Sequence, residues 1–235
     1  MHYLSWLKDI SMLNLKRMND FIDRNIQDYV EKHTENEPKL LKKLNKETHL
    51  KILHPRMLCS PYQGRLLSII SKIFQPKSVL EIGTYTGYST LCIAEGLDKK
   101  GTILTIDCNE ELIEIQNRYF KESHFRNNII QHTGKALDII PKLESFYDFV
   151  YLDADKENYI NYYNLIIEKL VPGGLILSDN VLWSGKVVDK ETNFDFITKQ
   201  LVTFNKLLKK DPRIETFVMP IRDGITISRK TKASS

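Results

Sequence analysis

Residues 147–180, YDFVYLDADKENYINYYNLIIEKLVPGGLILSDN, decide the fold of this chain. An apolar run at 149–152 is followed by a segment, 157–170, whose length and apolar spacing predict a helix. A Pro-Gly-Gly sequence at 172–174 ends that helix, and a second apolar run follows at 175–177. Strands that are apolar throughout are typical of a parallel sheet covered on both faces. The stretch therefore predicts one strand–helix–strand unit of an α/β protein.

Acidic and amide side chains stand where these two strands end. Asp153 follows the first run, and Asp179 with Asn180 ends the second, about one strand–helix–strand repeat later. Neighbouring strands lie about 4.8 Å apart, and ligands of open α/β sheets bind outside the carboxyl ends of the strands. Three oxygen ligands without cysteine or histidine suit Mg²⁺ or Ca²⁺ better than zinc. We expect the three side chains to converge on a divalent cation; the alternative is that they only cap loops and helix starts.

The rest of the chain repeats the same alternation. Further elements are expected as strands at 78–83, 103–107 and 128–132, and as helices at 62–74, 89–95, 110–122, 136–140 and 195–208. Two late strands, 214–219 and 224–228, follow each other too closely for a crossover connection, so they must pair antiparallel. The prediction is a Rossmann-like α/β fold: a seven-stranded, mostly parallel sheet with a C-terminal antiparallel β-hairpin and helices on both faces.

Residues 1–56 are expected to form an N-terminal helical arm. Apolar residues recur at helical spacing over about 15–30, and a second, lysine-rich helix is expected at 39–47. The lysines are expected to form a solvated face. The pattern leaves open whether the arm covers the active site, mediates dimerisation, or does both. Residues 57–235 are expected to hold the catalytic machinery, and no linker splits the chain.

The composition fits one large globular domain. The chain has 235 residues, 42% hydrophobic and 27% charged, without a biased tract. Its net charge of +4 is spread along the chain and does not by itself argue for nucleic acid. Three unclustered cysteines fit a reducing compartment, and neither a secretory signal nor an apolar stretch of about 18 residues is found. We therefore expect a cytoplasmic protein that binds neither nucleic acid nor membrane.

The strand at 78–83 opens into a glycine turn that reads Gly83-x-x-x-Gly87. Asp107 stands at the tip of the next strand, where an acid holds the ribose diol in Rossmann-like nucleoside binders. These features alone do not separate NAD from S-adenosylmethionine.

Two details favour S-adenosylmethionine over a dinucleotide. Tyr85 occupies the place of the second glycine of a G-x-G-x-x-G motif, the glycine that lets the backbone approach a pyrophosphate. Glu81 and Asp155 are expected on the rim of the same site, where their carboxylates would repel a diphosphate and attract an ammonium and a sulfonium. An NAD-dependent oxidoreductase remains as an alternative.

Five motifs of the chain closely resemble those of the cation-dependent O-methyltransferases, the caffeoyl-CoA and catechol O-methyltransferase-like enzymes. They are EIGTYTGYS at 81–89, DADKENY at 153–159, PGGLI at 172–176, DNVLW at 179–183 and RDG at 222–224. The resemblance extends over about 57–228 and implies a class I methyltransferase sheet in a homodimer.

The resemblance also implies roles for individual residues. Asp153, Asp179 and Asn180 resemble the metal ligands, and Lys156 resembles the catalytic base beside Asp153. The pocket for S-adenosylmethionine, taken position by position, would be formed by Met57, Cys59, Glu81, Gly83, Thr84, Tyr85, Ser89, Asp107, Ala136 and Asp155.

The acceptor would lie beside the metal ligands, in contact with Asp153 and Lys156. Ser184 stands where plant members of the family use an asparagine to hold the substrate. Trp183, in a loop after the metal motif, is a candidate wall against an aromatic ring, with a buried anchor as the alternative. Tyr159, Tyr162 and Tyr163, on the helix of the central stretch, are expected to be packing residues, with substrate contacts as the alternative.

The resemblance therefore implies methyl transfer from S-adenosylmethionine to a hydroxyl of a catechol-type phenolic, free or as a CoA ester, with S-adenosylhomocysteine as product. The divalent cation is expected to be Mg²⁺, with Ca²⁺ and Mn²⁺ left open. The lysine-rich arm suggests an alternative from another class, a nucleic-acid methyltransferase or RNA-binding module. A site built of acids argues against it, because such a site repels phosphates.

Overall fold

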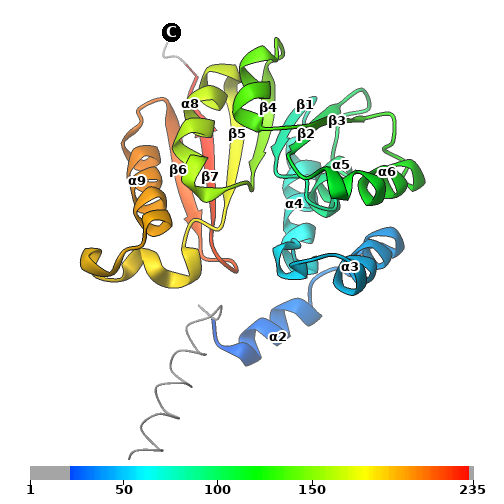
Figure 1. Cartoon of the computed structure of the whole chain (residues 1–235), viewed down its shortest axis with the longest axis horizontal. Helices are drawn as coiled ribbons and strands as arrows, with labels where there is room; N and C mark the ends of the chain where they lie inside the picture. Colours follow the sequence, from blue (N-terminus) through cyan, green and yellow to red (C-terminus); the bar gives the residue numbers. More distant parts are fainter. Residues whose placement is uncertain (1–21, 233–235) are drawn as a thin grey trace, which may run out of the picture.

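The computed structural model describes residues 22–232, whose centre is one seven-stranded sheet in the order β3-β2-β1-β4-β5-β7-β6 (Figure 1). The strands are β1 (Ser78–Ile82), β2 (Thr102–Asp107), β3 (Ile129–Thr133), β4 (Tyr147–Leu152), β5 (Leu170–Asp179), β6 (Ile214–Met219) and β7 (Ile225–Lys230). Strands β1 to β5 run parallel, whereas β7 is antiparallel to both β5 and β6. The predicted Rossmann-like fold with its C-terminal antiparallel hairpin is confirmed.

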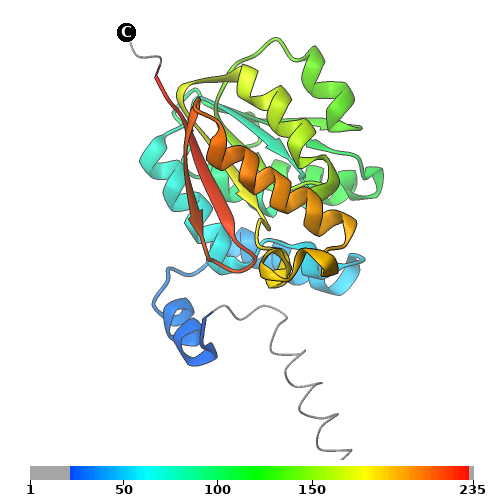
Figure 2. The same cartoon turned by 90° about the vertical axis from the view of Figure 1, so that its left-hand side faces the viewer.

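Helices cover both faces of this sheet (Figures 1 and 2). In the described part of the chain they are α2 (Arg24–Lys32), α3 (Lys39–Lys51), α4 (Pro61–Phe74), α5 (Tyr88–Ala94), α6 (Ile113–Glu122), α7 (Ala136–Ile139), α8 (Tyr159–Lys169) and α9 (Phe196–Lys210). Helices α3 to α6 contribute to the core on one face, and α7 to α9 contribute to the core on the other.

Strand β4 shows why the central stretch is apolar at every position. Phe149 and Tyr151 face the core under α4 and α5, whereas Val150 and Leu152 face the core under α8. All four are completely buried. Burying a large apolar side chain contributes about 1.5–3 kcal/mol relative to leaving it exposed. Because β4 is covered on both faces, apolar and polar residues do not alternate along it.

The strand register brings three chain segments together at the carboxyl edge of the sheet. Ile82 of β1 pairs with Leu152 of β4, and Leu152 pairs with Ser178 of β5. The residues that follow, Gly83 and Asp153, are so close that a Cβ on Gly83 would lie 2.0 Å from the Asp153 carbonyl oxygen. Gly83 also has a φ of +101°. Only glycine fits this crossing point.

The helix predicted at 157–170 begins and ends differently in the structure. A 3₁₀ turn, η4 (Lys156–Asn158), precedes α8, and β5 already begins at Leu170. The chain thus passes from helix to strand before the Pro-Gly-Gly sequence, because residues 170–174 extend the pairing with β4 through an irregular register.

The second helix of the predicted arm belongs to the body of the molecule. Leu41 and Leu44 of α3 are buried in the core that also contains α5 and α6. Glu47 of α3 accepts two hydrogen bonds from Arg118 (2.8 and 2.9 Å) and one from Tyr119 (2.8 Å), both on α6. The lysines of α3 are exposed, as expected. The part of the arm predicted before residue 22 lies outside the described residues, and its division from the rest at residue 56 stays a prediction.

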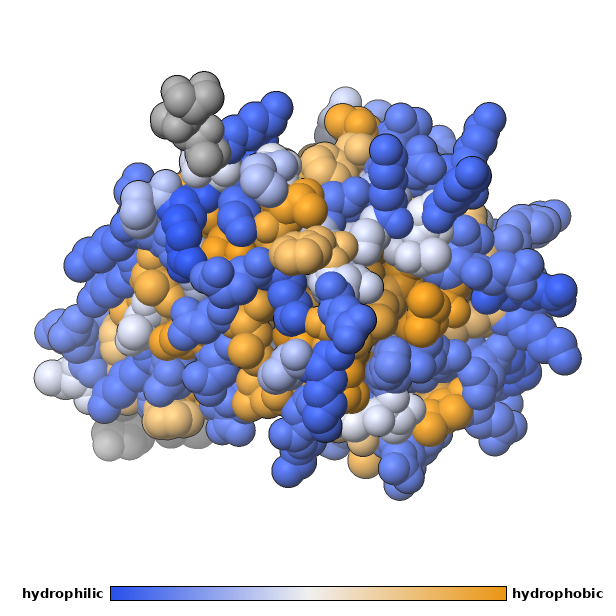
Figure 3. Space-filling view, turned by 90° about the horizontal axis from the view of Figure 1, so that it is seen from above, coloured by the Kyte–Doolittle hydropathy of each residue, from blue (hydrophilic) through white to orange (hydrophobic). Residues whose placement is uncertain are grey.

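The surface seen in Figure 3 is largely hydrophilic, with separate hydrophobic patches between charged side chains. No helix within residues 22–232 has the length and the apolar character needed to cross a membrane.

Candidate active site

A cavity of about 1350 Å³ opens at the carboxyl edge of the sheet. It is lined by the segments that follow β1, β2, β4 and β5, by residues 51–59, which contain the 3₁₀ turn η1 (Pro55–Met57), and by the turn between β6 and β7. The residues predicted to bind the cofactor that line this cavity are Met57, Cys59, Gly83, Thr84, Tyr85, Ser89, Asp107, Ala136 and Asp155. The predicted cofactor residues thus line one cavity, except Glu81.

Asp107 is fixed at the tip of β2 by backbone hydrogen bonds. The Tyr85 N–H donates to Oδ2 (2.6 Å), and the Asn109 N–H donates to Oδ1 (2.8 Å). Tyr85 has a left-handed backbone, with a φ of 49°. Tyr85, which stands in place of the motif glycine, therefore adopts a backbone conformation typical of glycine, and its backbone N–H orients Asp107.

Glu81 does not lie on the rim of the cavity, so that expectation is wrong. Its side chain is completely buried on the α5 side of β1 and accepts hydrogen bonds from Ser89 Oγ (2.7 Å), Thr105 Oγ1 (2.6 Å) and Thr90 Oγ1. Burial raises its pKa to about 7. Glu81 thus stands behind Ser89, which does line the cavity.

Asp155 lines the cavity with its carboxylate held on both oxygens. Tyr162 Oη donates to Oδ1 (2.5 Å), and Asn158 Nδ2 donates to Oδ2. Tyr162 lines the cavity as well. The tyrosine therefore orients an acid of the cavity wall in addition to packing in the core.

The three candidate metal ligands, Asp153, Asp179 and Asn180, all line the cavity, at the ends of the paired strands β4 and β5. Asp179 is 4% exposed, and its pKa is raised to about 6, by burial and next by the charge of Asp153. Two carboxylates that repel each other, beside an amide oxygen and within reach of a ligand cavity, fit a hard divalent cation. Within residues 22–232 no group of three or more His, Cys, Asp or Glu side chains could hold a metal ion. The candidate set depends on Asn180 as its third ligand.

A buried polar network orients Asp179. Gln63 Nε2 donates to Asp179 Oδ2 (2.5 Å), and Tyr151 Oη donates to the same oxygen (2.9 Å). Gln63 Nε2 also lies 3.1 Å from Tyr151 Oη. Sequence reasoning missed both residues. A glutamine in the first turn of a helix that packs on the sheet and a tyrosine in a fully buried strand were the features that could have revealed them.

Lys156 is held by two partners. Its Nζ donates to Asp153 Oδ1 (2.8 Å) and to Tyr159 Oη (2.8 Å). Tyr159 Oη lies within donating distance of the backbone carbonyls of Asp179 (2.9 Å) and Leu152 (3.2 Å). A phenol has only one proton, so Tyr159 directs it to a carbonyl and offers a lone pair to the lysine. The packing role expected for Tyr159 is therefore only half of its role.

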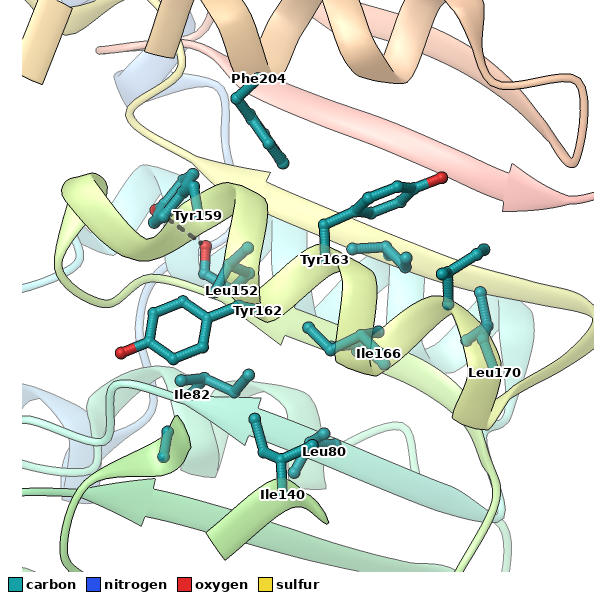
Figure 4. Packing of buried hydrophobic residues seen from close by; sticks show 14 of the residues in the cluster. Leu80, Ile82, Ile140, Leu152, Tyr159, Tyr162, Tyr163, Ile166, Leu170 and Phe204 are labelled. Carbon is teal, nitrogen blue, oxygen red and sulfur yellow. Dashed lines mark hydrogen bonds between the residues drawn. The ribbon is translucent and has the colours of Figure 1, made fainter. Parts of the chain in front are cut away.

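Figure 4 shows how Tyr159 lies between Leu152 and Phe204. The ring of Tyr159 packs edge-on against Phe204 of α9, with ring centroids 5.2 Å apart, while its hydroxyl reaches the end of β4 at Leu152. Core packing thus sets the position of the hydroxyl that meets Lys156.

The two residues predicted for the acceptor differ in their placement. Trp183 lines the cavity, and its Nε1 is buried without a hydrogen-bond partner among the described residues. Ser184 does not line the cavity; its N–H donates to Asp223 Oδ1. The structure therefore does not bring Ser184 to the site where the acceptor was expected. Its backbone N–H instead links the loop after β5 to the turn between β6 and β7.

Comparison with known proteins identifies the family of this chain. A family model described as O-methyltransferase matches residues 31–231, which extends the resemblance seen in the motifs through α3. A caffeoyl-CoA O-methyltransferase of Nicotiana tabacum is 36% identical over 207 residues, covering 83% of this chain and 85% of the relative. A caffeoyl-CoA O-methyltransferase of Medicago sativa is 37% identical over 191 residues, covering 75% of this chain and 76% of the relative.

Solved structures show the same fold. An SAH-bound methyltransferase of Podospora anserina has a TM-score of 0.81 at 26% identity, covering 90% of this chain and 97% of that one. An O-methyltransferase of Bacillus cereus in complex with SAH has a TM-score of 0.81 at 26% identity, covering 88% and 97%. The family and enzyme class expected from the motifs are confirmed: this chain belongs to the O-methyltransferase family.

Proposed function

We propose that the protein transfers the methyl group of S-adenosylmethionine to a hydroxyl of a catechol-type phenolic, with a divalent cation, Mg²⁺ in the first instance, beside the acceptor. The observation that carries this proposal is a single cavity that contains Asp107 and also Asp153, Asp179 and Asn180. Relatives named caffeoyl-CoA O-methyltransferases and neighbours solved with SAH or, in Streptomyces achromogenes, with SAM support it.

The ends of the cavity would have different tasks. Asp107, oriented by two backbone N–H groups, would hold the ribose diol, and Ser89 with Glu81 behind it would face the charged methionine part of the cofactor. Asp153 and Asp179 lie next to β4 and β5, two and three strands from β2. The methyl donor would thus lie between the ribose site and the acceptor.

In the reaction the S–CH₃ bond of the sulfonium breaks, an O–CH₃ bond forms, and S-adenosylhomocysteine leaves. The phenol must lose its proton, and a phenol has a pKa of about 10. Asp153, Asp179 and Asn180 would hold the cation, whose binding supplies acidification of a coordinated hydroxyl. Lys156, in its neutral form, would accept the proton, with its position set by Asp153 and Tyr159. Alignment of acceptor and methyl donor can supply roughly 7–11 kcal/mol.

The test is methyl transfer from radiolabelled S-adenosylmethionine to a panel of catechols and their CoA esters, with and without added metal. Turnover should require the metal, and Asp153→Ala and Asp179→Ala should abolish it while S-adenosylhomocysteine still binds in calorimetry. Full activity in EDTA would refute the metal-dependent form of the proposal. The oxidoreductase and nucleic-acid alternatives gain no support from the relatives found.

A further inference from the structure

Arg222 lies in the turn between β6 and β7, and this turn is joined to the loop that follows Asn180. The Leu182 N–H donates to the Asp223 carbonyl oxygen (2.9 Å), and the Ser184 N–H donates to the Asp223 carboxylate. Arg222 itself lines the cavity, as Asn180 does, and the Val181 N–H, next to Asn180, donates to the Gly224 carbonyl oxygen (3.2 Å). The hairpin turn therefore forms part of the wall around the acceptor.

The strand order places Arg222 far from the cofactor end of the cavity. From β2, which ends at Asp107, the order runs through β1, β4 and β5 to β7. Four spacings between strands correspond to about 19 Å. A ligand group near Arg222 is thus on the far side of the acceptor from the ribose site.

Within the described residues, 22–232, no hydrogen bond and no ion pair reaches the Arg222 guanidinium. Burial raises the pKa of the neighbouring Asp223, and the charges of Lys156 and Arg222 oppose this rise, so Arg222 acts on Asp223 without forming an ion pair with it. Lys156, the other cation near the acceptor, is paired with Asp153 at 2.8 Å. The backbone of Arg222 is also left-handed, with a φ of 51°. A bulky side chain is unfavourable there, so backbone preference does not account for an arginine at this position.

We propose that Arg222 is the residue that binds an anionic group of the acceptor, a carboxylate or a phosphate, and so sets the preference of this site among catechols. This inference rests on the proposed function, which places the acceptor beside Asp179 and Asn180. The planar guanidinium donates in a fork that matches both kinds of anion. Asp153 is paired with Lys156 and would hold the cation together with Asp179, and the Asp223 carboxylate accepts from the Ser184 N–H. The donors of the Arg222 guanidinium therefore remain available to the acceptor.

The experiment compares three acceptors that share one catechol: 3,4-dihydroxycinnamyl alcohol, which is neutral, 3,4-dihydroxycinnamate, which has a carboxylate, and its CoA ester, which has phosphates. The variant is Arg222→Asn, because asparagine tolerates the left-handed backbone while the charge is removed. Arg222→Lys keeps the charge and loses the fork. Arg126→Asn makes the same chemical change outside the cavity wall. Binding by calorimetry and kcat/KM are both measured, in the presence of Mg²⁺.

The wild type should prefer an anionic acceptor, and Arg222→Asn should reduce that preference about ten- to a hundredfold. Arg222→Lys should lie between the two, and Arg126→Asn should match the wild type. Whether the free acid or the CoA ester responds identifies the carboxylate or the phosphate as the anion. An equal preference in the wild type and Arg222→Asn overturns the proposal. If no catechol is methylated but the Arg222-dependent preference in binding is found, the proposed reaction fails and the anion site stands.

Discussion

At the scale of single residues, the site depends on buried polar side chains that hold the reactive groups in place. Gln63 and Tyr151 hold one oxygen of Asp179, Tyr159 meets Lys156, and Tyr162 meets Asp155. A buried donor that loses its partner costs about 1–3 kcal/mol, so each of these contacts fixes a rotamer strongly. The orientations of the reactive side chains are therefore set by hydrogen bonds from residues of the core.

Removing the Tyr151 hydroxyl should weaken metal binding. In Tyr151→Phe, Asp179 loses one of its two side-chain donors, and we expect about a tenfold lower affinity, as for other residues that orient metal ligands. The measurement is a titration with Mn²⁺ followed by electron paramagnetic resonance. Tyr147→Phe is the matched control, because Tyr147 is a buried tyrosine at the opposite end of β4. An unchanged Mn²⁺ affinity in Tyr151→Phe would contradict this role.

The burial of Glu81 predicts a change of stability with pH in the ligand-free protein. Its pKa rises from 4.5 to about 7 in the folded state, so the folded state binds the proton more tightly than the unfolded state does. Stability from this group is greatest below about pH 4.5 and falls by about 3 kcal/mol as the pH rises to about 7.

Glu81→Gln should lack this fall, so the variant should gain stability relative to the wild type between pH 5 and pH 8. Urea unfolding at both pH values measures the difference. Glu215→Gln, at an exposed glutamate of β6, should leave the pH profile as it is. Parallel profiles for the wild type and Glu81→Gln would show that Glu81 titrates normally.

At the scale of elements, the site exists because the ends of β1, β4 and β5 are in register. Gly83 and Asp153 follow paired residues, and the close approach of their backbones brings the cofactor turn against the metal ligands. The hairpin of β6 and β7 adds the last wall, through its hydrogen bonds to residues 181–184. Apart from residues 51–59, these walls are direct continuations of strands.

Gly83→Ala should separate these strand ends. The new Cβ would meet the Asp153 carbonyl at 2.0 Å, in addition to the cost of about 1–2 kcal/mol for a left-handed alanine. Gly173→Ala is the matched control, because Gly173 also has a positive φ, +84°, but its Cβ would meet nothing closer than 3.9 Å. We expect both variants to be less stable, Gly83→Ala by clearly more, and only Gly83→Ala to lose S-adenosylhomocysteine binding. Equal losses of stability would mean that the strand ends adapt to the added methyl.

At the scale of the whole molecule, one cavity is assembled from segments spread over the chain. Residues 51–59 close it from the N-terminal side, with Tyr85 Oη close to the carbonyls of Leu53 (3.3 Å) and His54 (3.2 Å). A ligand in this cavity touches both halves of the sheet. Binding should therefore stabilise the molecule as a unit. The predicted homodimer and cytoplasmic location stay predictions.

S-adenosylhomocysteine should raise the free energy of unfolding by about 2.7 kcal/mol at a hundredfold excess over its Kd. Thermal unfolding with increasing ligand measures this effect, and NADH at the same concentration should leave the Tm unchanged. A rise of Tm with NADH alone would favour a dinucleotide in the cavity and contradict the choice made from the glycine turn.

The sequence by itself determined the strand order along the chain, the antiparallel end and the carboxyl edge as the site. Such features follow from local apolar runs, turn residues and crossover lengths. It also located Asp107, Asp153, Asp179 and Asn180, since acids at strand tips are visible in the order of residues.

Only the tertiary structure decided where the remaining groups point. It placed Glu81 behind Ser89, brought Gln63 and Tyr151 to Asp179, and moved Ser184 out of the cavity wall. The reason is physical: side chains far apart in sequence meet only when helices pack on the sheet. The partner that satisfies a buried polar atom is chosen by that packing and not by its neighbours along the chain.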